Sequence, residues 1–261
     1  MMRKIVLSYQ KNVRDLGGYV GFNGLKVKEN RLYRGGFLGR VSTEDVKIIN
    51  SLKLTDIVDF RSKTEYTDRP DYAFMGVTFH NLPTMDESND EQLKKNNEFD
   101  DSNLLWFLNG STDGKGHMKR TYVDVLFSVN GRESLKEFFS LLVKDEHRVV
   151  YFHCSQGKDR AGLAAYLLLT ALGVSEKDKI KDYLDSNEAM AIKIPNLKRM
   201  LKDKPYYDKE YERALEEVFS ADLEYLNAAL DAVKESCGSV MNYLTDVLQV
   251  DISRLREIYL E

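Results

Sequence analysis

One stretch of the sequence constrains the fold more than any other: an apolar strand pattern that runs through a glycine-containing loop into an apolar helix pattern. Residues 148–153 are mostly β-branched and aromatic, which is typical of a buried central strand. Residues 161–172 place leucine and alanine at helical spacing, and Gly173 closes the pattern. A strand, a loop and a helix in this order, among further strands and helices, indicate an α/β fold.

The rest of the chain predicts further strands before residue 85 and an almost entirely helical part after residue 172. The expected strands cover 25–33, 54–60 and 77–82, and the late helices cover 175–187, 210–235 and 238–249. A helix is expected to begin at Ser42-Thr43, since apolar residues follow at helical spacing. No internal repeat or low-complexity linker interrupts the 261 residues, so residues 1–261 are expected to form a single domain.

Residues 84–120 differ in composition from their surroundings. They combine several acidic residues with Asn and Gly, and they contain one apolar island at residues 104–108. One interpretation is a surface insertion with a single anchoring helix. The other is a lid over a site, because long loops in compact domains are often functional.

Composition argues against several classes of protein. The net charge of −4 disfavours a general affinity for nucleic acid or an anionic membrane. Cys154 and Cys237 form no CxxC pair and the four histidines are scattered, so neither a disulfide framework nor a metal site is expected. No segment suits a membrane span or a signal peptide, so a cytoplasmic location is expected, with secretion left open if a leader has been removed.

The loop between the predicted strand and helix, residues 153–160, carries the sequence His-Cys-Ser-Gln-Gly-Lys-Asp-Arg. Backbone N–H groups in such a loop can point inward, and the N-terminus of the next helix adds about half a positive charge. With Lys158 and Arg160 at its rim, the loop is expected to bind a phosphate dianion and to favour the thiolate of Cys154. Arg160 can hold two phosphoryl oxygens, and Gly157 lets the backbone turn. The competing interpretation is a buried, inert cysteine beside a coincidental basic pair.

The spacing His-Cys-x-x-Gly-x-x-Arg resembles the phosphate loop of the protein tyrosine phosphatase superfamily. Residues 157–162 are similar to a bacterial branch that acts on phosphotyrosine and phosphoinositides. Other segments resemble that branch in the expected order: 12–18, 32–35, 59–62 with Glu65, 172–174, 182–187, 225–226, 238–240 and 243–244. The resemblance implies a central mixed β-sheet flanked by helices, with a largely helical C-terminal half.

The resemblance also implies a metal-free, cofactor-free, two-step reaction. Cys154 would form a cysteinyl-phosphate intermediate while Arg160 holds the phosphoryl group, and water would then hydrolyse the intermediate. The remaining loop residues are expected to bind substrate: His153, Ser155, Gln156, Gly157 and Lys158. Lys158 would either be solvated at the rim or contact a second phosphate of a phosphoinositide. Expected partners are phosphorylated proteins or phosphoinositides, and a monomer is favoured.

The general acid is left open among three aspartates, with Asp59 preferred to Asp159 and Asp159 preferred to Asp86. Asp59 ends a predicted strand, and the resemblance places the equivalent residue beside the site, although it could be a structural partner of a neighbouring arginine. Asp159 lies in the loop, where neighbouring cations favour its ionised form. Asp86 lies in the insertion and could act from a mobile segment.

Ala161 departs from the superfamily pattern, which usually has Ser or Thr at this position. The missing hydroxyl supports an alternative function, a phosphate-binding pseudophosphatase with slow or absent turnover. A sulfur carrier or an arsenate-reducing enzyme would also use a cysteine in an anion loop. The loop spacing disfavours both, and the lack of a second cysteine near Cys154 also disfavours arsenate reduction.

Replacement of Ala161 by Thr tests the effect of that departure. We expect the cysteinyl-phosphate of the parent protein to last longer than that of Ala161→Thr, since the departing sulfur lacks one hydrogen-bond donor. Burst kinetics with a chromogenic aryl phosphate measure the hydrolysis rate of the intermediate. Equal rates in the two proteins would contradict the prediction.

Overall fold

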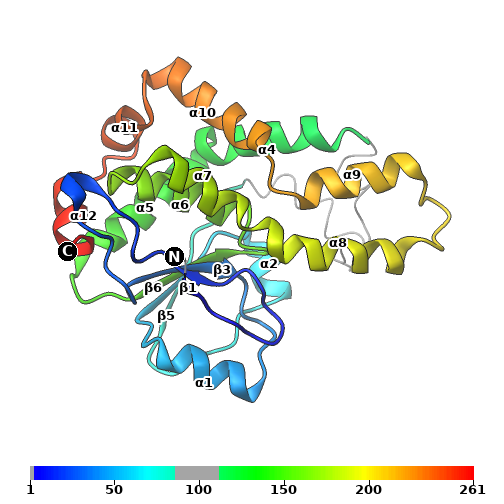
Figure 1. Ribbon diagram of the computed structural model, residues 1–261, viewed down its shortest axis with the longest axis horizontal. Coiled ribbons are helices and arrows are strands. Elements are labelled where there is room, and N and C mark those ends of the chain that lie inside the picture. The colour runs from blue at the N-terminus through cyan, green and yellow to red at the C-terminus, as the bar shows by residue number, and fades with distance from the viewer. Residues whose placement is uncertain (1–2, 86–111) are drawn as a thin grey trace.

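The computed structural model describes residues 3–85 and 112–261, which form a six-stranded mixed sheet with helices on both faces (Figure 1). The strands are β1 (Arg3–Lys4), β2 (Arg14–Asp15), β3 (Leu32–Gly36), β4 (Asp56–Asp59), β5 (Thr78–Asn81) and β6 (Val150–Cys154), in the order β1-β2-β3-β6-β4-β5. The strands β3, β6, β4 and β5 run parallel, and β1 and β2 are antiparallel additions. The predicted α/β fold with a central mixed sheet is confirmed.

Helices dominate the second half of the chain, as predicted. The helices are α1 (Thr43–Ser51), α2 (Lys63–Asp68), α4 (Gly114–Phe127), α5 (Val129–Lys144), α6 (Arg160–Ala171), α7 (Glu176–Leu184), α8 (Asn187–Leu201), α9 (Lys209–Phe219), α10 (Leu223–Cys237), α11 (Val240–Asn242) and α12 (Ile252–Tyr259). A 3-10 turn (Phe22–Gly24) and a π-helical turn (Tyr243–Val247) complete the described elements. In Figure 1, α1 lies on one side of the sheet, whereas α4, α6, α7 and α10 lie on the other.

The sheet separates two hydrophobic cores, because successive side chains of a strand point to opposite faces. Ile57 and Tyr151 pack with α1 in the smaller core. Val58 and Phe152 pack in the larger core, which includes most of α6. Almost every residue of α6 is buried, so β6 and α6 form a rigid unit that holds the intervening loop at both ends.

The helix predicted at Ser42-Thr43 is confirmed. The Ser42 side chain accepts a hydrogen bond from the Asp45 N–H, and the Asp45 carboxylate accepts one from the Ser42 N–H. The same reciprocal arrangement, a capping box, joins Ser62 and Glu65 at the start of α2. The second box matters for the site, because it fixes the position of Glu65.

Two local predictions are wrong. The strand expected at 25–33 begins only at Leu32, because the chain turns at Asn30 (φ 60°), whose N–H donates to the Asp15 carboxylate at 2.8 Å. The helix expected at 210–235 is divided, with α9 ending at Phe219 and Asp222 capping α10. In both places a polar side chain that hydrogen-bonds the backbone overrides the longer pattern.

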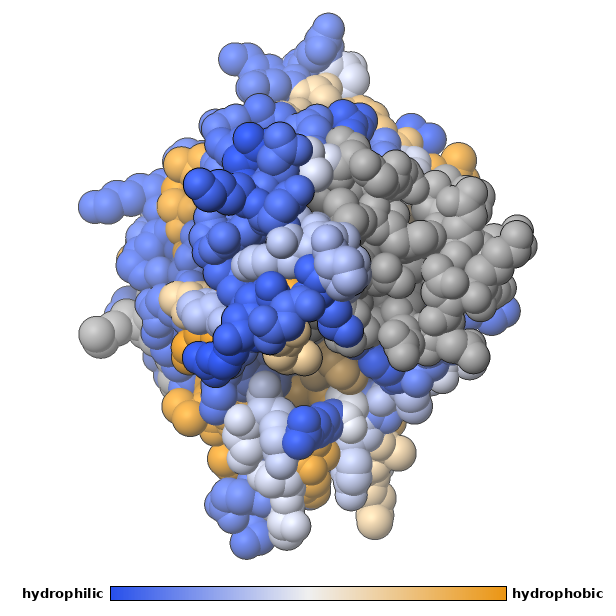
Figure 2. Space-filling model, turned by 90° about the vertical axis from the view of Figure 1, so that its right-hand side faces the viewer, coloured by the Kyte–Doolittle hydropathy of each residue, from blue (hydrophilic) through white to orange (hydrophobic). Residues whose placement is uncertain are grey.

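The segment 84–120 is described only in part. Residues 114–120 belong to α4, and residues 86–111 lie outside the described residues, so the apolar island and the lid remain expectations. Among the described residues, no helix is long and apolar enough to cross a membrane. In Figure 2, the described part of the face toward which α8 and α9 extend is mainly hydrophilic, with hydrophobic residues in small separate areas.

Candidate active site

The predicted phosphate loop lies where the carboxyl ends of the parallel strands meet. Residues 155–159 connect Cys154, the last residue of β6, to the start of α6, as the sequence predicts. The parallel register places Gly36 of β3 beside Cys154 and Asp59 of β4 beside His153. Cys154 is 2% exposed, so its sulfur lies at the base of the site.

The backbone of the loop is oriented from behind by two side chains. The Gln156 carbonyl accepts a hydrogen bond from Asn12 Nδ2 at 3.0 Å, and the Gly157 carbonyl accepts one from Arg34 Nη2 at 2.8 Å. Because C=O and N–H point in opposite directions across a trans peptide, the N–H groups of Gly157 and Lys158 face away from these partners. No described residue accepts a hydrogen bond from either N–H. Both donors are therefore available to an anion.

Glycines allow the loop to lie directly on the end of β3. Gly157 has φ +68°, and a Cβ atom there would lie 2.2 Å from the Gly35 carbonyl carbon. A side chain at position 157 would thus push the loop away from β3.

A buried cluster of charged groups holds Asn12 and Arg34, the two side chains that hydrogen-bond the loop carbonyls. Asp182 of α7 accepts a hydrogen bond from Arg14 Nε at 2.8 Å and is also bonded to Arg34. Arg14 in turn donates to the Asn12 side-chain oxygen at 2.5 Å. Burial alone would raise the pKa of Asp182, but Arg14 and Arg34 lower it, so the carboxylate stays charged. Asp182 thereby connects α7 to the side chains that orient the loop.

Arg160 is held by Glu65 of α2. Its Nη1 donates to Glu65 Oε2 at 2.5 Å, and its Nη2 donates to Oε1 at 3.1 Å. Ser155 Oγ donates to the same carboxylate and accepts from Arg160 Nη2 at 3.1 Å. Burial would raise the pKa of Glu65, but the charge of Arg160 and these hydrogen bonds lower it to about 2. Burial would likewise lower the pKa of Arg160, and the charges of Glu65 and Cys154 raise it instead. The pair is a fixed, fully charged bidentate clamp.

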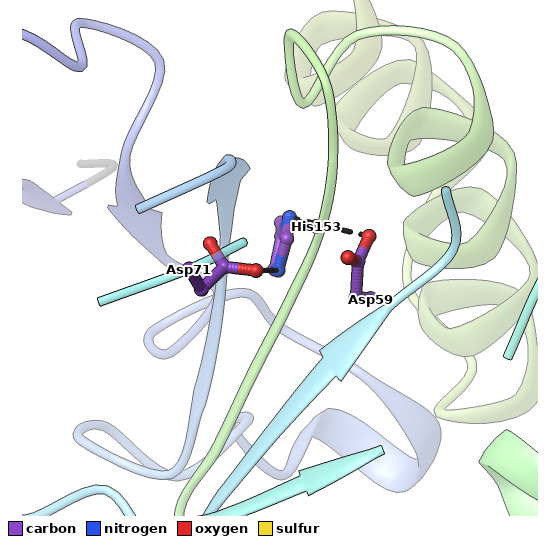
Figure 3. A group of neighbouring side chains, drawn as sticks. All are labelled: Asp59, Asp71 and His153. Carbon is purple, nitrogen blue, oxygen red and sulfur yellow. Dashed lines mark ion pairs between the residues drawn. The ribbon is translucent and has the colours of Figure 1, made fainter. Parts of the chain in front are cut away.

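His153 lies behind the loop between two carboxylates (Figure 3). Its Nε2 is 3.2 Å from Asp71 Oδ2, and its Nδ1 is 3.7 Å from Asp59 Oδ1. Burial would lower the pKa of His153, but Asp71 and Asp59 raise it above its usual value.

These three side chains have donor atoms close enough to hold a metal ion. The guanidinium of Arg61 already lies between the carboxylates, with Nη2 at 2.8 Å from Asp59 and 2.9 Å from Asp71. A cation thus occupies this position, and the cluster is a structural ion-pair network.

Lys158 is not at the rim, so that expectation is wrong. Its side chain is 1% exposed, and its ammonium group donates to the Val218 carbonyl at 3.0 Å, to the Ser220 carbonyl at 3.1 Å and to Asp159. All three N–H donors are used within the fold, and the ammonium group connects the loop to the end of α9. A direct contact with a second phosphate is not supported.

The structure places two of the three candidate acids very differently. Asp59 is buried, and both its carboxylate oxygens accept hydrogen bonds from Arg61 Nε, at 3.0 and 2.9 Å. The Asp159 side chain is 22% exposed and accepts a hydrogen bond from the Tyr122 hydroxyl at 2.6 Å. Asp86 lies outside the described residues.

Residues 5–261 match the sequence profile of the tyrosine phosphatase family, and the match includes the entire loop and its supporting segments. The chain belongs to the tyrosine phosphatase family. A protein of Cupriavidus necator named "putative tyrosine-protein phosphatase" is 35% identical over 256 residues, which cover 95% of this chain and 85% of the relative. The triple specificity protein phosphatase of Mycobacterium tuberculosis is 26% identical over 277 aligned positions, covering 95% of this chain and 99% of the relative. The predicted phosphatase identity is confirmed.

Several supporting residues could not be assigned a role from the sequence. Glu65 was visible only as part of a family segment, and its Ser-x-x-Glu context looks like an ordinary capping box. Asp182 and Arg34 lie in segments that resemble the family, but their pairing joins residues that are 148 positions apart. Tyr122 carries no sequence signal for its contact with the loop.

The ion pair of Glu65 predicts a change in activity and in acid stability. Glu65→Gln removes the charge that holds Arg160, so we expect kcat/KM to fall by about 10²-fold. The folded-state pKa of about 2 lies below the ordinary 4.5, so the stabilisation is present above about pH 4.5 and is lost as the pH falls toward 2. The free energy of unfolding, measured by urea denaturation, should therefore decline less steeply with acid in Glu65→Gln than in the parent. Equal slopes would contradict the prediction.

Because Lys158 is buried, we expect its replacement to lower the free energy of unfolding without changing which phosphoinositide is preferred. Lys158→Met leaves two carbonyl groups without a donor, so we expect a loss of about 2–4 kcal/mol in the free energy of unfolding. Rates with phosphoinositides that carry one phosphate on the ring and with those that carry two should fall by the same factor, since both have alkyl leaving groups. A selective loss with the doubly phosphorylated lipid would restore the second-phosphate contact.

Proposed function

We propose that this phosphatase hydrolyses phosphomonoesters, phosphotyrosine and phosphoinositides among them, through a cysteinyl-phosphate intermediate. The observation that carries this proposal is the loop itself, in which the N–H groups of Gly157 and Lys158 lack acceptors among the described residues. Cys154 begins the loop, and Arg160 ends it with its guanidinium fixed by Glu65. A phosphate group bound to these donors would be placed directly over the sulfur.

In the first step, the Cys154 thiolate attacks phosphorus and an S–P bond forms. The bond from phosphorus to the leaving oxygen breaks, and its electron pair stays on that oxygen, which takes a proton from an acid. Arg160 and the loop N–H groups stabilise the charge on the three equatorial oxygens. In the second step, water attacks phosphorus, the S–P bond breaks, and the electron pair returns to sulfur.

We assign the acid to Asp159. Asp59 is fully engaged with Arg61, and a donor must be able to hold and release a proton. Asp159 is partly exposed, and among the described residues nothing donates a hydrogen bond to its Oδ2 atom. After the first step its carboxylate would act as the base that takes a proton from the attacking water.

Broad specificity is supported by one of the relatives, since the Mycobacterium tuberculosis protein is named a triple specificity phosphatase. We propose that specificity for the leaving group is low because the strongest contacts go to the phosphoryl group. His153, Ser155 and Gln156 shape the loop through their contacts with Asp71, Glu65 and Asn12.

We further propose a cytoplasmic location. Cys154 and Cys237 are free cysteines, and a nucleophilic thiol suits a reducing compartment. The expectation of a monomer remains a prediction.

A substrate panel tests the proposed function. Release of phosphate from phosphotyrosine peptide, phosphoserine peptide and phosphoinositides should be abolished by Cys154→Ser. Asp159→Asn should lower kcat by about 10²–10³-fold, and the loss should grow as the leaving group becomes poorer.

Asp59→Asn is the matched control for the acid, because it also removes one carboxylate beside the loop. The loss of kcat in Asp59→Asn should be independent of the leaving group and should accompany a lower free energy of unfolding. A leaving-group dependence in Asp59→Asn but not in Asp159→Asn would reverse the assignment. Binding of phosphate without Cys154-dependent release would favour the pseudophosphatase that Ala161 suggests.

A further inference from the structure

Asp159 is the N-cap residue of α6, yet its side chain caps nothing. Its carboxylate makes no hydrogen bond to the first turn of the helix. Aspartates at the same position in other helices do accept such a bond, as Asp208 does in α9, Asp222 in α10 and Asp251 in α12. The Asp159 carboxylate therefore does not bond a backbone N–H of the first turn of α6, and it points toward α4 instead.

One oxygen of this carboxylate takes both of the hydrogen bonds that the described residues provide. Asp159 Oδ1 accepts from the Tyr122 hydroxyl at 2.6 Å and from the Lys158 ammonium group. Among the described residues, Oδ2 accepts none. The two oxygens of one carboxyl group are thus in different environments.

Tyr122 is held in place by a second tyrosine. Its hydroxyl lies 2.8 Å from the Tyr183 hydroxyl, which lies 3.1 Å from the Asp222 carbonyl. Tyr122 and Tyr183 are completely buried, and their rings pack edge to face with centroids 6.2 Å apart. Three elements, α4, α7 and the start of α10, thereby fix one hydroxyl against the loop.

Tyr122 remains a hydrogen-bond donor at any pH at which the enzyme works. Burial raises its pKa well above the ordinary value, and the negative charge of Asp159 raises it further. A neutral phenol has one hydrogen, and a carboxylate oxygen at 2.6 Å is its strongest acceptor. Tyr122 consequently gives its one hydrogen to Asp159 Oδ1.

We propose that Tyr122 is a positioning residue that fixes Oδ1 of Asp159, so that the proton given to the leaving group is carried on Oδ2. This inference rests on the assignment of Asp159 as the acid. With donors from Tyr122 and Lys158 directed at Oδ1, a proton added to the carboxyl group goes to Oδ2. Oδ2–H then protonates the leaving oxygen, and the resulting carboxylate takes a proton from water in the second step.

Two further phenols face Asp159 but do not bond it. Tyr183 and Tyr225 are neutral, because burial raises the pKa of both phenols. Removal of the Tyr122 hydroxyl leaves Lys158 as the remaining described donor to Oδ1.

The test compares Tyr122→Phe with the parent on aryl phosphates whose leaving groups differ in basicity. We expect kcat to fall by about 10-fold for an alkyl-substituted phenyl phosphate and by less than about 2-fold for a dinitrophenyl phosphate, which needs little protonation. Competitive inhibition by inorganic phosphate, which reports the loop, should stay unchanged.

Tyr225→Phe is the matched control. Tyr225 packs against Tyr122 with ring centroids 5.9 Å apart, and its hydroxyl donates to the Glu217 carbonyl rather than to Asp159. Tyr225→Phe removes an equivalent hydroxyl from the same aromatic cluster and should leave the leaving-group dependence of kcat unchanged. The positioning role would be wrong if kcat of Tyr122→Phe fell by the same factor with every leaving group. It would also be wrong if Tyr225→Phe had the same effect as Tyr122→Phe.

Asp159→Asn in the same series distinguishes a wrong acid assignment from a wrong positioning role. If Asp159→Asn shows leaving-group dependence and Tyr122→Phe shows none, the acid assignment stands and the positioning role is wrong. If neither variant shows leaving-group dependence, both the acid assignment and the positioning role are wrong.

Discussion

The orientation of the peptide groups in the phosphate loop depends on a buried ion cluster behind it. Arg34 holds the Gly157 carbonyl, and Asp182 holds Arg34 and Arg14. Burying charged groups is costly unless they are paired with opposite charges. Here each guanidinium bonds both a carboxylate and a polar group that either belongs to the loop or hydrogen-bonds to it. Loss of Asp182 would leave two guanidinium charges in the interior without a carboxylate partner. The cluster therefore ties correct loop geometry to the stability of the whole fold.

A second constraint is the close contact between the loop and the end of β3. Gly35 and Gly157 lie against one another, and a Cβ atom on Gly35 would lie 2.3 Å from the Tyr151 hydroxyl. Tyr151 itself donates to the Gly36 carbonyl at 2.5 Å. The loop is therefore confined between β3, α7 and α6.

The sequence predicted the parts of the site that are contiguous in the chain and missed those that are not. The strand, loop and helix around Cys154 follow from local periodicity and from one spacing motif, and the structure confirms all three elements. Lys158 was misplaced because its neighbours in sequence suggest an open, basic rim, whereas its partners, Val218 and Ser220, come from a helix end about sixty residues away. Glu65 was hidden because Ser-x-x-Glu is the ordinary signature of a helix start, and here one carboxylate serves both the cap and Arg160.

Nucleophile, phosphate clamp and proposed acid all lie within one loop, and this has a mechanistic consequence. In an enzyme whose acid lies on a separate segment, the acid must arrive before each first step. Here Asp159 is one residue before Arg160 and is anchored to α4 through Tyr122, so its distance from Cys154 is set by the same backbone that we propose binds phosphate. In the proposed mechanism, the same carboxylate would already be in place as a base once the cysteinyl-phosphate had formed. The departure of sulfur, where Ala161 supplies no hydroxyl, would then limit the second step, rather than the activation of water.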